Sequence, residues 1–479
     1  MATTFSTPGV YIQEVSTLPA SIAQVETAIP AFIGLTKKTV TEPKRITSMV
    51  EYLDIFGGAK ENVITIDIID DVSNSGTDVV SGTVGVDSAS QKRNLFYHMQ
   101  MYFANGGGPC WIVSAGADTG SITKTKVTDA LDKIKMEDEP TLIVIPEAVY
   151  ISTSGHFYDV MKASLSQCNL LQDRFTIIDL QDDSGNFTSD PSAFRTGIGT
   201  QYLKYGAAYY PRLKTTLLYN DASVKVTYSS GNNTNIATAI GSGRTLAEII
   251  SLADDVSAVN YSTVGKYLSQ FLSEQLGSMR NTIAKQQIIL GPSSSIAGVY
   301  ASVDRDLGVW KAPANVSLNY VSEPSFKLNN EDQESFNVHS TGKSINVVRL
   351  FSGKGSLVWG ARTLAGNDNE WRYIPVRRLF ISIEESVKKA TEFVVFEPND
   401  KNTWERTRAM IENYLTVLWR QGALAGAKPE AAFFVNVGLG ETMTAQDILE
   451  GKLIIEVGIA AVRPAEFIIL NFSHKLQES

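Results

Sequence analysis

The chain has 479 residues, of which 43% are hydrophobic and 19% are charged, and it carries a formal net charge of -9 with a pI of about 5.2. This composition is typical of globular protein, favours about two to four domains, and disfavours broad binding to the phosphates of nucleic acid. No apolar run is long enough to predict a membrane span, and no basic region followed by an apolar core indicates a secretory leader.

The first predicted element is a strand over residues 8–15, "PGVYIQEV", which follows a Pro-Gly pair. Its residues Val10, Tyr11, Ile12 and Val15 favour the extended state. No hairpin turn follows, and the next apolar stretch begins only at Ala28. A lone strand is at best marginally stable in water, so this strand needs a partner that its own neighbourhood does not supply.

The middle of the chain predicts a doubly wound α/β layer. Short, wholly apolar strands alternate with longer helical patterns, which indicates parallel strands joined by helical crossovers. The predicted strands are 28–35, 110–113, 141–145, 175–180 and 206–210, and the predicted helices are 45–58, 94–105, 126–135, 157–171 and 192–204. The first of these helices has Ser48 near its start and Gly57-Gly58 at its end.

Several segments interrupt this alternation. Residues 61–90 contain short alternating apolar runs and predict a small β-insertion, whereas residues 213–243 read as a polar loop or a β-excursion. A long helix is predicted over 264–289, and the polar stretch 322–343 resembles a junction between domains.

The last part of the chain predicts an α+β domain. Two strands meet around Gly353 and Gly355, a helical stripe covers 376–396, and a second helix begins near Asn402, a predicted N-cap. The first of these helices offers two i,i+4 ion pairs, Glu384 with Lys388 and Glu385 with Lys389. Strands follow within 431–438 and 452–462, and "RPAEFIILNFSHKL" closes the chain.

Neither metal nor cofactor chemistry is predicted. Cys110 and Cys168 lie far apart in apolar segments, so we expect two buried, reduced thiols. The four histidines are too few and scattered to build a metal site with them. The glycines of "NGGGP", residues 105–109, close a helix instead of opening one, which favours a helix C-cap over a phosphate cradle.

Serine catalysis is a weak alternative. Ser293, Ser294 and Ser295 lie in a loop that runs into a probable helix, but a catalytic serine needs a histidine held between it and an acid. None of the histidines belongs to a recognisable local catalytic motif; they are His98, His156, His339 and His474. We therefore predict that the protein is not an enzyme.

Two groups of arginines could form a basic face. Arg372, Arg377 and Arg378 are close in sequence, and the following helix carries Arg406, Arg408 and Arg420. No aromatic platforms alternate with these charges, so nucleic acid is not an expected partner. The alternatives are a solvated face and a contact with an acidic protein surface.

Five blocks of the sequence resemble contractile tail sheath proteins. They are residues 7–34, 291–315, 360–386, 402–435 and 442–470, and the resemblance is closest in the last two. It implies a structural subunit that polymerises as stacked hexameric rings around an inner tube. On triggering, such a sheath shortens and widens and drives the tube through a target envelope, without ATP at the moment of firing.

The resemblance also implies partners and a setting. The partners are further copies of the chain, the inner tube protein, baseplate proteins and tail-terminator or cap proteins, with sister sheath proteins as an open alternative. Nucleic acid and direct membrane insertion are not expected. Assembly is expected in the bacterial cytoplasm, within a phage tail or a phage-tail-like particle, with release from the cell as a further alternative.

For the fold, the resemblance implies a subtilisin-like middle domain that lacks the catalytic histidine and acid. The expected organisation is an N-terminal arm (1–27), the subtilisin-like domain (28–340) with variable insertions near 59–92 and 212–262, a C-terminal domain that lines the tube (341–460), and a C-terminal arm (461–479). Both arms are expected to add as strands to the C-terminal domain of neighbouring subunits.

The expected contact residues follow from this organisation. The N-terminal arm strand comprises Val10, Tyr11, Ile12, Glu14 and Val15, and the C-terminal arm strand comprises Phe467, Ile468, Ile469, Leu470 and Phe472. The candidate tube contacts are Lys401, Arg406 and Arg408 on the helix from Asn402 to Gln421 or just before it. Two rival functions are a soluble hydrolase on the same α/β layer and a static capsid or tube subunit.

Overall fold

A computed structural model describes residues 22–59, 62–70, 80–81, 84–86, 95–218, 224–230 and 287–468. These residues form two compact units. The larger unit comprises Glu26–Ser382 with the described residues from Arg463 onward, and the smaller comprises Ile383–Val462 with the described residues before Glu26. No helix within the described ranges is both long and apolar enough to cross a bilayer.

An eight-stranded sheet forms the centre of the larger unit, in the order β15-β14-β9-β8-β7-β1-β6-β2. The six central strands are parallel, and β2 and β15 add antiparallel at the two edges. The strands are β1 (Pro30–Thr36), β2 (Lys44–Ile46), β6 (Cys110–Ala117), β7 (Leu142–Val144), β8 (Phe175–Asp179), β9 (Gly206–Tyr210), β14 (Asn346–Phe351) and β15 (Gly355–Trp359).

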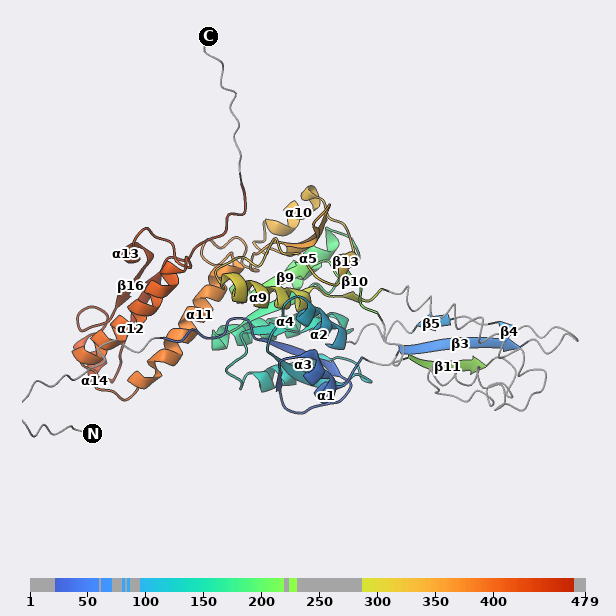
Figure 1. The fold of residues 1–479 in the computed structure, drawn as a ribbon, viewed down its shortest axis with the longest axis horizontal. Helices are drawn as coiled ribbons and strands as arrows, with labels where there is room; N and C mark the ends of the chain where they lie inside the picture. The colour runs from blue at the N-terminus through green and yellow to red at the C-terminus, as the bar shows by residue number, and fades with distance from the viewer. Residues whose placement is uncertain are drawn as a thin grey trace, which may run out of the picture. The chain divides into compact units, whose positions relative to one another are not determined.

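Helices cover this sheet on both faces. The chain runs from β1 to β6 on one side and then returns to β7, β8 and β9 on the other, so right-handed crossovers place α2 on one face and both α3 and α4 on the opposite face. Accordingly α2 packs beside α9, and α3 packs beside α4 (Figure 1). The helices are α1 (Met49–Phe56), α2 (Leu95–Ala104), α3 (Lys124–Ile134), α4 (His156–Leu171), α5 (Ser189–Gly197), α9 (Ser293–Leu307) and α10 (Asn330–Asn337).

Because both faces are covered, the central strands are buried throughout. Every residue of β1, β7, β8 and β9 is buried, which explains their largely apolar sequences, with Thr36, Thr176 and Asp179 as buried polar exceptions. Cys110 and Cys168 are free and buried in this core, as predicted, and burial raises the pKa of both thiols. The predicted caps of α1 are also confirmed, since the Ser48 side chain accepts from the Glu51 N–H and Gly57 ends the helix.

The two predicted insertions meet in one small sheet. The first contributes β3 (Asn62–Asp70), β4 (Val80–Ser81) and β5 (Val84–Val86), and the second contributes β11 (Val224–Ser230). Strand β11 pairs in parallel with β3 along its whole length. The helix predicted over 264–289 lies outside the described residues except for residues 287–289. The last of these, Ile289, begins strand β12 (Ile289–Leu290).

Several boundaries differ from the sequence-based expectation, and the helix predicted over 45–58 begins only at Met49, after strand β2. Residues 322–343 are not a junction between domains, because they contain most of β13 (Val321–Pro324) and all of α10 and lie inside the larger unit. The units divide instead within α11 (Ile374–Thr391), since β14 and β15 complete the large sheet. Helix α5 is shorter than predicted and ends at Gly197, just before Gly199 takes a positive φ of 76°.

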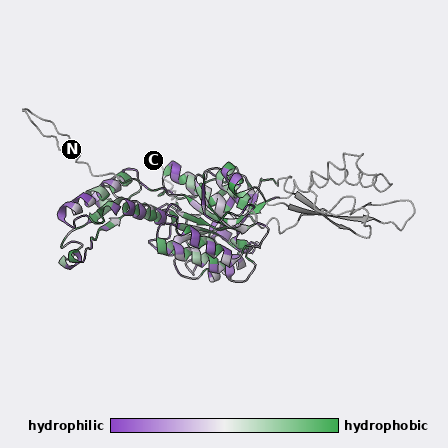
Figure 2. Cartoon of the chain, turned by 90° about the horizontal axis from the view of Figure 1, so that it is seen from below, coloured by the Kyte–Doolittle hydropathy of each residue, from purple (hydrophilic) through white to green (hydrophobic). Residues whose placement is uncertain are grey.

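The smaller unit is built on helices and one short sheet. It contains the end of α11, α12 (Lys401–Arg420), α13 (Pro429–Ala432), α14 (Ala445–Leu449) and strands β16 (Phe433–Asn436) and β17 (Glu456–Ile459). The N-cap of α12 is Asp400, not Asn402, and its carboxylate accepts from the Thr403 N–H at 2.9 Å. Its helices show hydrophobic and hydrophilic faces in alternation (Figure 2), as the spacing of the buried residues in α12 requires.

Candidate functional site

The smaller unit presents a sheet of two strands. Strands β16 and β17 pair antiparallel from Phe433 opposite Ile459 to Asn436 opposite Glu456, and α12 packs against β16. Among the described residues no third strand joins this sheet, although a single bridge links Leu424 to Ala461. A sheet of two strands is marginal by itself, and open strand edges readily accept another chain.

The sheet also carries exposed apolar surface. Phe434 is 49% exposed, and its ring lies against Gly458 directly across the sheet. A Cβ at position 458 would stand 2.1 Å from the Phe434 ring, so glycine is needed there to let the ring lie against the strand. The same unit exposes Leu439, Leu449 and Ile454. Exposed apolar side chains beside open strand edges indicate a surface that another chain covers.

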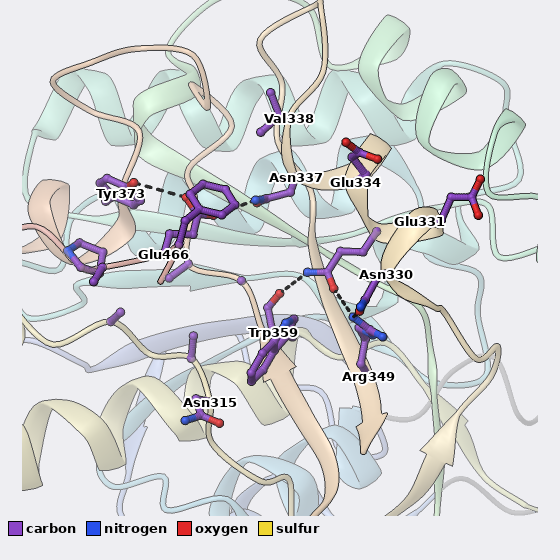
Figure 3. A pocket seen from close by; sticks show the side chains of 18 residues that line it. Asn315, Asn330, Glu331, Glu334, Asn337, Val338, Arg349, Trp359, Tyr373 and Glu466 are labelled. Carbon is purple, nitrogen blue, oxygen red and sulfur yellow. Dashed lines mark hydrogen bonds between the residues drawn. The ribbon is translucent and has the colours of Figure 1, made fainter. Parts of the chain in front are cut away.

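We call residues 463–468 of the predicted C-terminal arm its root, and they belong to the larger unit. Residues 464–467 line a cavity of about 900 Å³ together with α10, Arg349 of β14 and Trp359 of β15 (Figure 3). Of the predicted arm strand, Phe467 is 70% and Ile468 is 80% exposed. Ile469, Leu470 and Phe472 lie outside the described residues, as does the whole predicted N-terminal strand, Val10, Tyr11, Ile12, Glu14 and Val15.

Glu466 fixes this root in place. Its carboxylate accepts from Arg362 Nε at 2.9 Å and Nη2 at 2.5 Å. It also accepts from Asn337 Nδ2 at 2.8 Å and from the Tyr373 hydroxyl at 3.3 Å (Figure 3). Burial opposes ionisation, but the hydrogen bonds from Arg362 and Asn337 outweigh it and lower the pKa of Glu466. No local pattern in the sequence could indicate this contact, because its partners lie far from Glu466 along the chain.

The three candidate tube contacts differ in their surroundings. Lys401 is exposed, and Arg406 is exposed above the Phe393 ring at 4.7 Å. Arg408 is engaged inside its own unit, because it donates to Glu441 at 2.8 Å and to the Val437 carbonyl at 2.6 Å. Lys401 and Arg406 are therefore better placed than Arg408 to meet another protein.

The expectation of a basic face at Arg377 and Arg378 is wrong. Both side chains are buried. Arg377 lies over the rings of Trp371 and Tyr205, at 4.4 Å and 5.1 Å, and Arg378 binds Asp304. Two consecutive arginines in a helix are typical of a solvent-exposed helix face. In the folded chain, aromatic rings cover Arg377, and Asp304 pairs with Arg378.

The three serines do meet an acid and a histidine. Ser293–Ser295 open α9, where Asp179 accepts from the Ser293 N–H at 2.7 Å and from its hydroxyl at 2.6 Å, while His98 Nδ1 lies 3.0 Å from Ser294 Oγ. The sequence did not indicate these contacts, because His98 and Asp179 come from α2 and β8 and lie far from the serines along the chain.

This buried group differs from a catalytic triad. The acid and the histidine bond different serines, whereas a triad holds the histidine between the acid and one nucleophile. All of these side chains are buried. Burial raises the pKa of Asp179 to about 7 against its bonds from Ser293, and burial lowers the pKa of His98 to about 3. The arrangement ties α9 and α2 to the end of β8.

The remaining histidines take other positions. His156 begins α4, and His339 bonds Thr341 within its loop at 2.9 Å. His474 lies outside the described residues. In the described part of the chain, His, Cys, Asp and Glu side chains form no group suited to a metal ion. The "NGGGP" glycines follow the end of α2, and Gly106 has a φ of 94°, as a C-cap requires.

Comparison with known proteins gives concordant results. The phage tail sheath C-terminal domain family matches residues 366–475. A chain of the six-fold symmetrised anti-feeding prophage (AFP) baseplate is 33% identical, with a TM-score of 0.62, over 99% of this chain and 100% of that one. A chain of the contracted sheath complex of PVC, an extracellular contractile injection system, is 32% identical over 99% of both chains, with a TM-score of 0.65.

Curated relatives match over shorter segments. The tail sheath protein of Vibrio phage KVP40 is 24% identical over 184 residues, which are 38% of this chain and 26% of that protein. A putative prophage major tail sheath protein of Pseudomonas aeruginosa is 21% identical over 36% of this chain and 43% of its own length. The matched segments thus span less than half of these curated relatives.

Proposed function

The chain belongs to the contractile tail sheath family, and from that premise we propose that its terminal segments join neighbouring sheath subunits by strand exchange. Its role is that of a structural sheath subunit, as the relatives matched over nearly their full length indicate. We propose further that it polymerises as stacked hexameric rings around an inner tube and that contraction drives the tube through a target envelope. Baseplate, tube and terminator proteins are its proposed partners, and the bacterial cytoplasm its proposed site of assembly.

The observation that carries strand exchange is the two-stranded β16–β17 sheet with exposed Phe434. Such a sheet becomes independently stable with three or more strands and a covered apolar face. The predicted arm strands, residues 10–15 and 467–472, supply alternating and continuous apolar sequence suited to that position. We also propose a subtilisin-like fold for the larger unit, supported by its doubly wound parallel sheet.

The energetics of this exchange suit a structure that must hold and then rearrange. Each backbone hydrogen bond contributes about 0.5–1.5 kcal/mol net, so one added strand of four or five bonds is modest by itself. Repetition through a polymer makes the assembly firm, because each further contact forms within an already joined lattice. The added strand and the sheet that binds it move together as one unit, so their hydrogen bonds stay formed while the subunits move.

Deletion of residues 2–16 tests the N-terminal strand. The truncated protein should be folded and soluble yet unable to form ordered cylinders by electron microscopy, with the full-length chain as control. Circular dichroism and size-exclusion chromatography verify that the truncated chain is folded. Ordered cylinders from the truncated chain would refute the exchange of this segment.

A point substitution tests the acceptor strand. Ala460 N–H bonds the Ala432 carbonyl, so ladder alternation turns the N–H of Val457 away from β16 and toward the outer edge of β17. Val457→Pro removes this outward donor and should prevent assembly. Val457→Thr keeps the donor and the β-branched shape, and should assemble normally; equal behaviour of the two variants would exclude β17 as the acceptor.

We propose that α12 faces the tube through Lys401 and Arg406. Arg408, which donates to Glu441 and to the Val437 carbonyl, lies on the same helix and is proposed as a secondary contact. Exposed ion pairs contribute about 0–1 kcal/mol each, which suits a contact that must break during contraction. Arg406→Glu should loosen the sheath from the tube in particles, whereas Arg420→Glu, at the far end of the same helix, serves as the matched control. Unchanged tube retention in the Arg406 variant would exclude this face.

A further inference from the structure

Two buried arginines in the larger unit contact the two ends of its chain. Arg362 is 4% exposed and Arg378 is 3% exposed, and both belong to the segment that leads from β15 into α11. Burying a guanidinium is unfavourable unless its donors are well satisfied. The partners that satisfy these two show what the segment holds.

Arg378 holds the N-terminal end. Its guanidinium donates to both Asp304 oxygens, at 2.9 Å and 2.5 Å, and Nη2 also donates to the Thr27 carbonyl at 2.9 Å. The Thr27 hydroxyl donates to Asp304 at 2.6 Å, which closes a ring of three residues. The Tyr300 ring lies 4.5 Å from the guanidinium carbon and covers the group.

Arg362 holds the C-terminal end through Glu466. Its own position is fixed, because its backbone N–H donates to Asn346 at 2.8 Å and its Nη1 donates to the Gly366 carbonyl at 3.3 Å. Glu466 stands between the exposed residues Ala465 and Phe467. The Glu466 side chain therefore attaches the C-terminal root to the larger unit. It does so through a bidentate ion pair with Arg362 and through further hydrogen bonds from Asn337 and Tyr373.

We propose that Arg362 and Arg378 act together as a bracket that holds the roots of both terminal arms on the larger unit. The two roots, at Thr27 and Glu466, lie within a few residues of the points where the chain passes between units, before Glu26 and after Val462. Residues 362–378 connect both roots to the large sheet through β15 and α11.

The bracket has a mechanical consequence, which rests on the proposed strand exchange. When a neighbouring subunit pulls on an exchanged strand, the pull reaches the arm root. The buried bidentate hydrogen bonds of Arg362 and Arg378 resist the pulling force there and transmit it to the large sheet. The root therefore does not detach from the larger unit residue by residue. Bending is then confined to residues outside the two roots, and the larger unit moves as one body.

The first test uses the soluble subunit and does not depend on assembly. In Glu466→Gln, a nitroxide label at residue 468 should become at least twofold more mobile by electron paramagnetic resonance, while a label at residue 26 is unchanged. In Thr27→Val, which removes the hydroxyl bond to Asp304, the gain in mobility should appear at residue 26 instead. Arg372→Gln is the matched control, because Arg372 lies in the same segment but bonds Asp368 and Asn369.

The second test uses assembled particles. Glu466→Gln should still form cylinders, because the arm strand itself is intact, but a larger fraction of sheaths should break or detach on contraction. The Arg372 variant should contract as the parent does. Breakage is counted by electron microscopy after triggering.

The outcomes separate the bracket from strand exchange. Unchanged label mobility at residue 468 in Glu466→Gln would overturn the anchoring itself. Increased mobility with wild-type contraction would overturn its mechanical role. Normal cylinders after deletion of residues 2–16 would instead refute strand exchange, and the mobility measurements on the free subunit would remain a separate test of the anchor.

Discussion

The two sheets of this protein differ in how completely they are built. The eight-stranded sheet has helices on both faces and ends in antiparallel edge strands, so its central strands satisfy their backbone groups within the chain. The β16–β17 sheet has two strands and an exposed phenylalanine. The comparison teaches that the larger unit, or body, completes its sheet within the chain, whereas the smaller sheet leaves strand edges open among the described residues, which is why we propose it as the connector to another chain.

The largest expected effect breaks the body. Phe32 is fully buried in β1, and Phe32→Ala should lower the free energy of unfolding of the larger unit by about 3–5 kcal/mol through lost burial and a cavity. Chemical denaturation followed by fluorescence measures this change. Assembly by any surviving folded protein should be normal, and a loss of less than about 1 kcal/mol would contradict the assignment of Phe32 to the core.

A smaller effect on the monomer separates the connector from the body. Phe434→Ser should change monomer stability by about 1 kcal/mol or less, because the ring is half exposed in the free subunit. The same substitution should strongly reduce cylinder formation, since it removes apolar surface that an added strand would cover. Leu449→Ser, in the same unit but on helix α14, is the control for a general loss of apolar surface. Equal loss of assembly in both variants would deny the sheet a special role.

The smallest effect sharpens the picture of the body through pH. The pKa of Asp179 is about 7 in the folded protein, above the unfolded value of about 3.9, so the folded state binds more protons between these values. Its contribution to stability is therefore fully present below about pH 4 and is lost as the pH rises through 7. Asp179→Asn does not titrate and still accepts from the Ser293 N–H.

The measurement is the difference in unfolding free energy between Asp179→Asn and the parent from pH 5 to pH 8. The difference should shift in favour of the variant as the pH rises. His98 titrates in the opposite sense, because its pKa of about 3 makes its contribution decline below about pH 6.5, but this effect is common to both proteins and cancels. A pH-independent difference would contradict the raised pKa of Asp179.

Local rules predicted much of the body. Apolar runs identified β1, β7, β8 and β9 because strands buried on both faces carry no polar alternation. Ser48 and Gly57 marked the ends of α1 because capping depends on residues within one turn of the helix end. These features persist because each is decided by a few consecutive residues.

Long-range pairing was beyond those rules. The sequence could not show that β11 joins β3, that Arg377 and Arg378 are buried, or that Asp179 and His98 reach separate serines. In each case the partner lies far along the chain, and a charged or polar side chain looks solvated until its partner is known. For the same reason the ion pair between Glu466, in the terminal segment, and Arg362, in a loop, could not be predicted.

The sequence by itself determined the alternation of buried strands and helices, the caps of α1 and the family resemblance, and it predicts a terminal strand that lacks a local partner. The tertiary structure alone decided which polar groups meet, where the units divide within α11, and which residues hold the C-terminal root. The physical reason is range: hydrophobic periodicity and capping act over a few residues, whereas buried ion pairs and strand order depend on segments that only folding brings together.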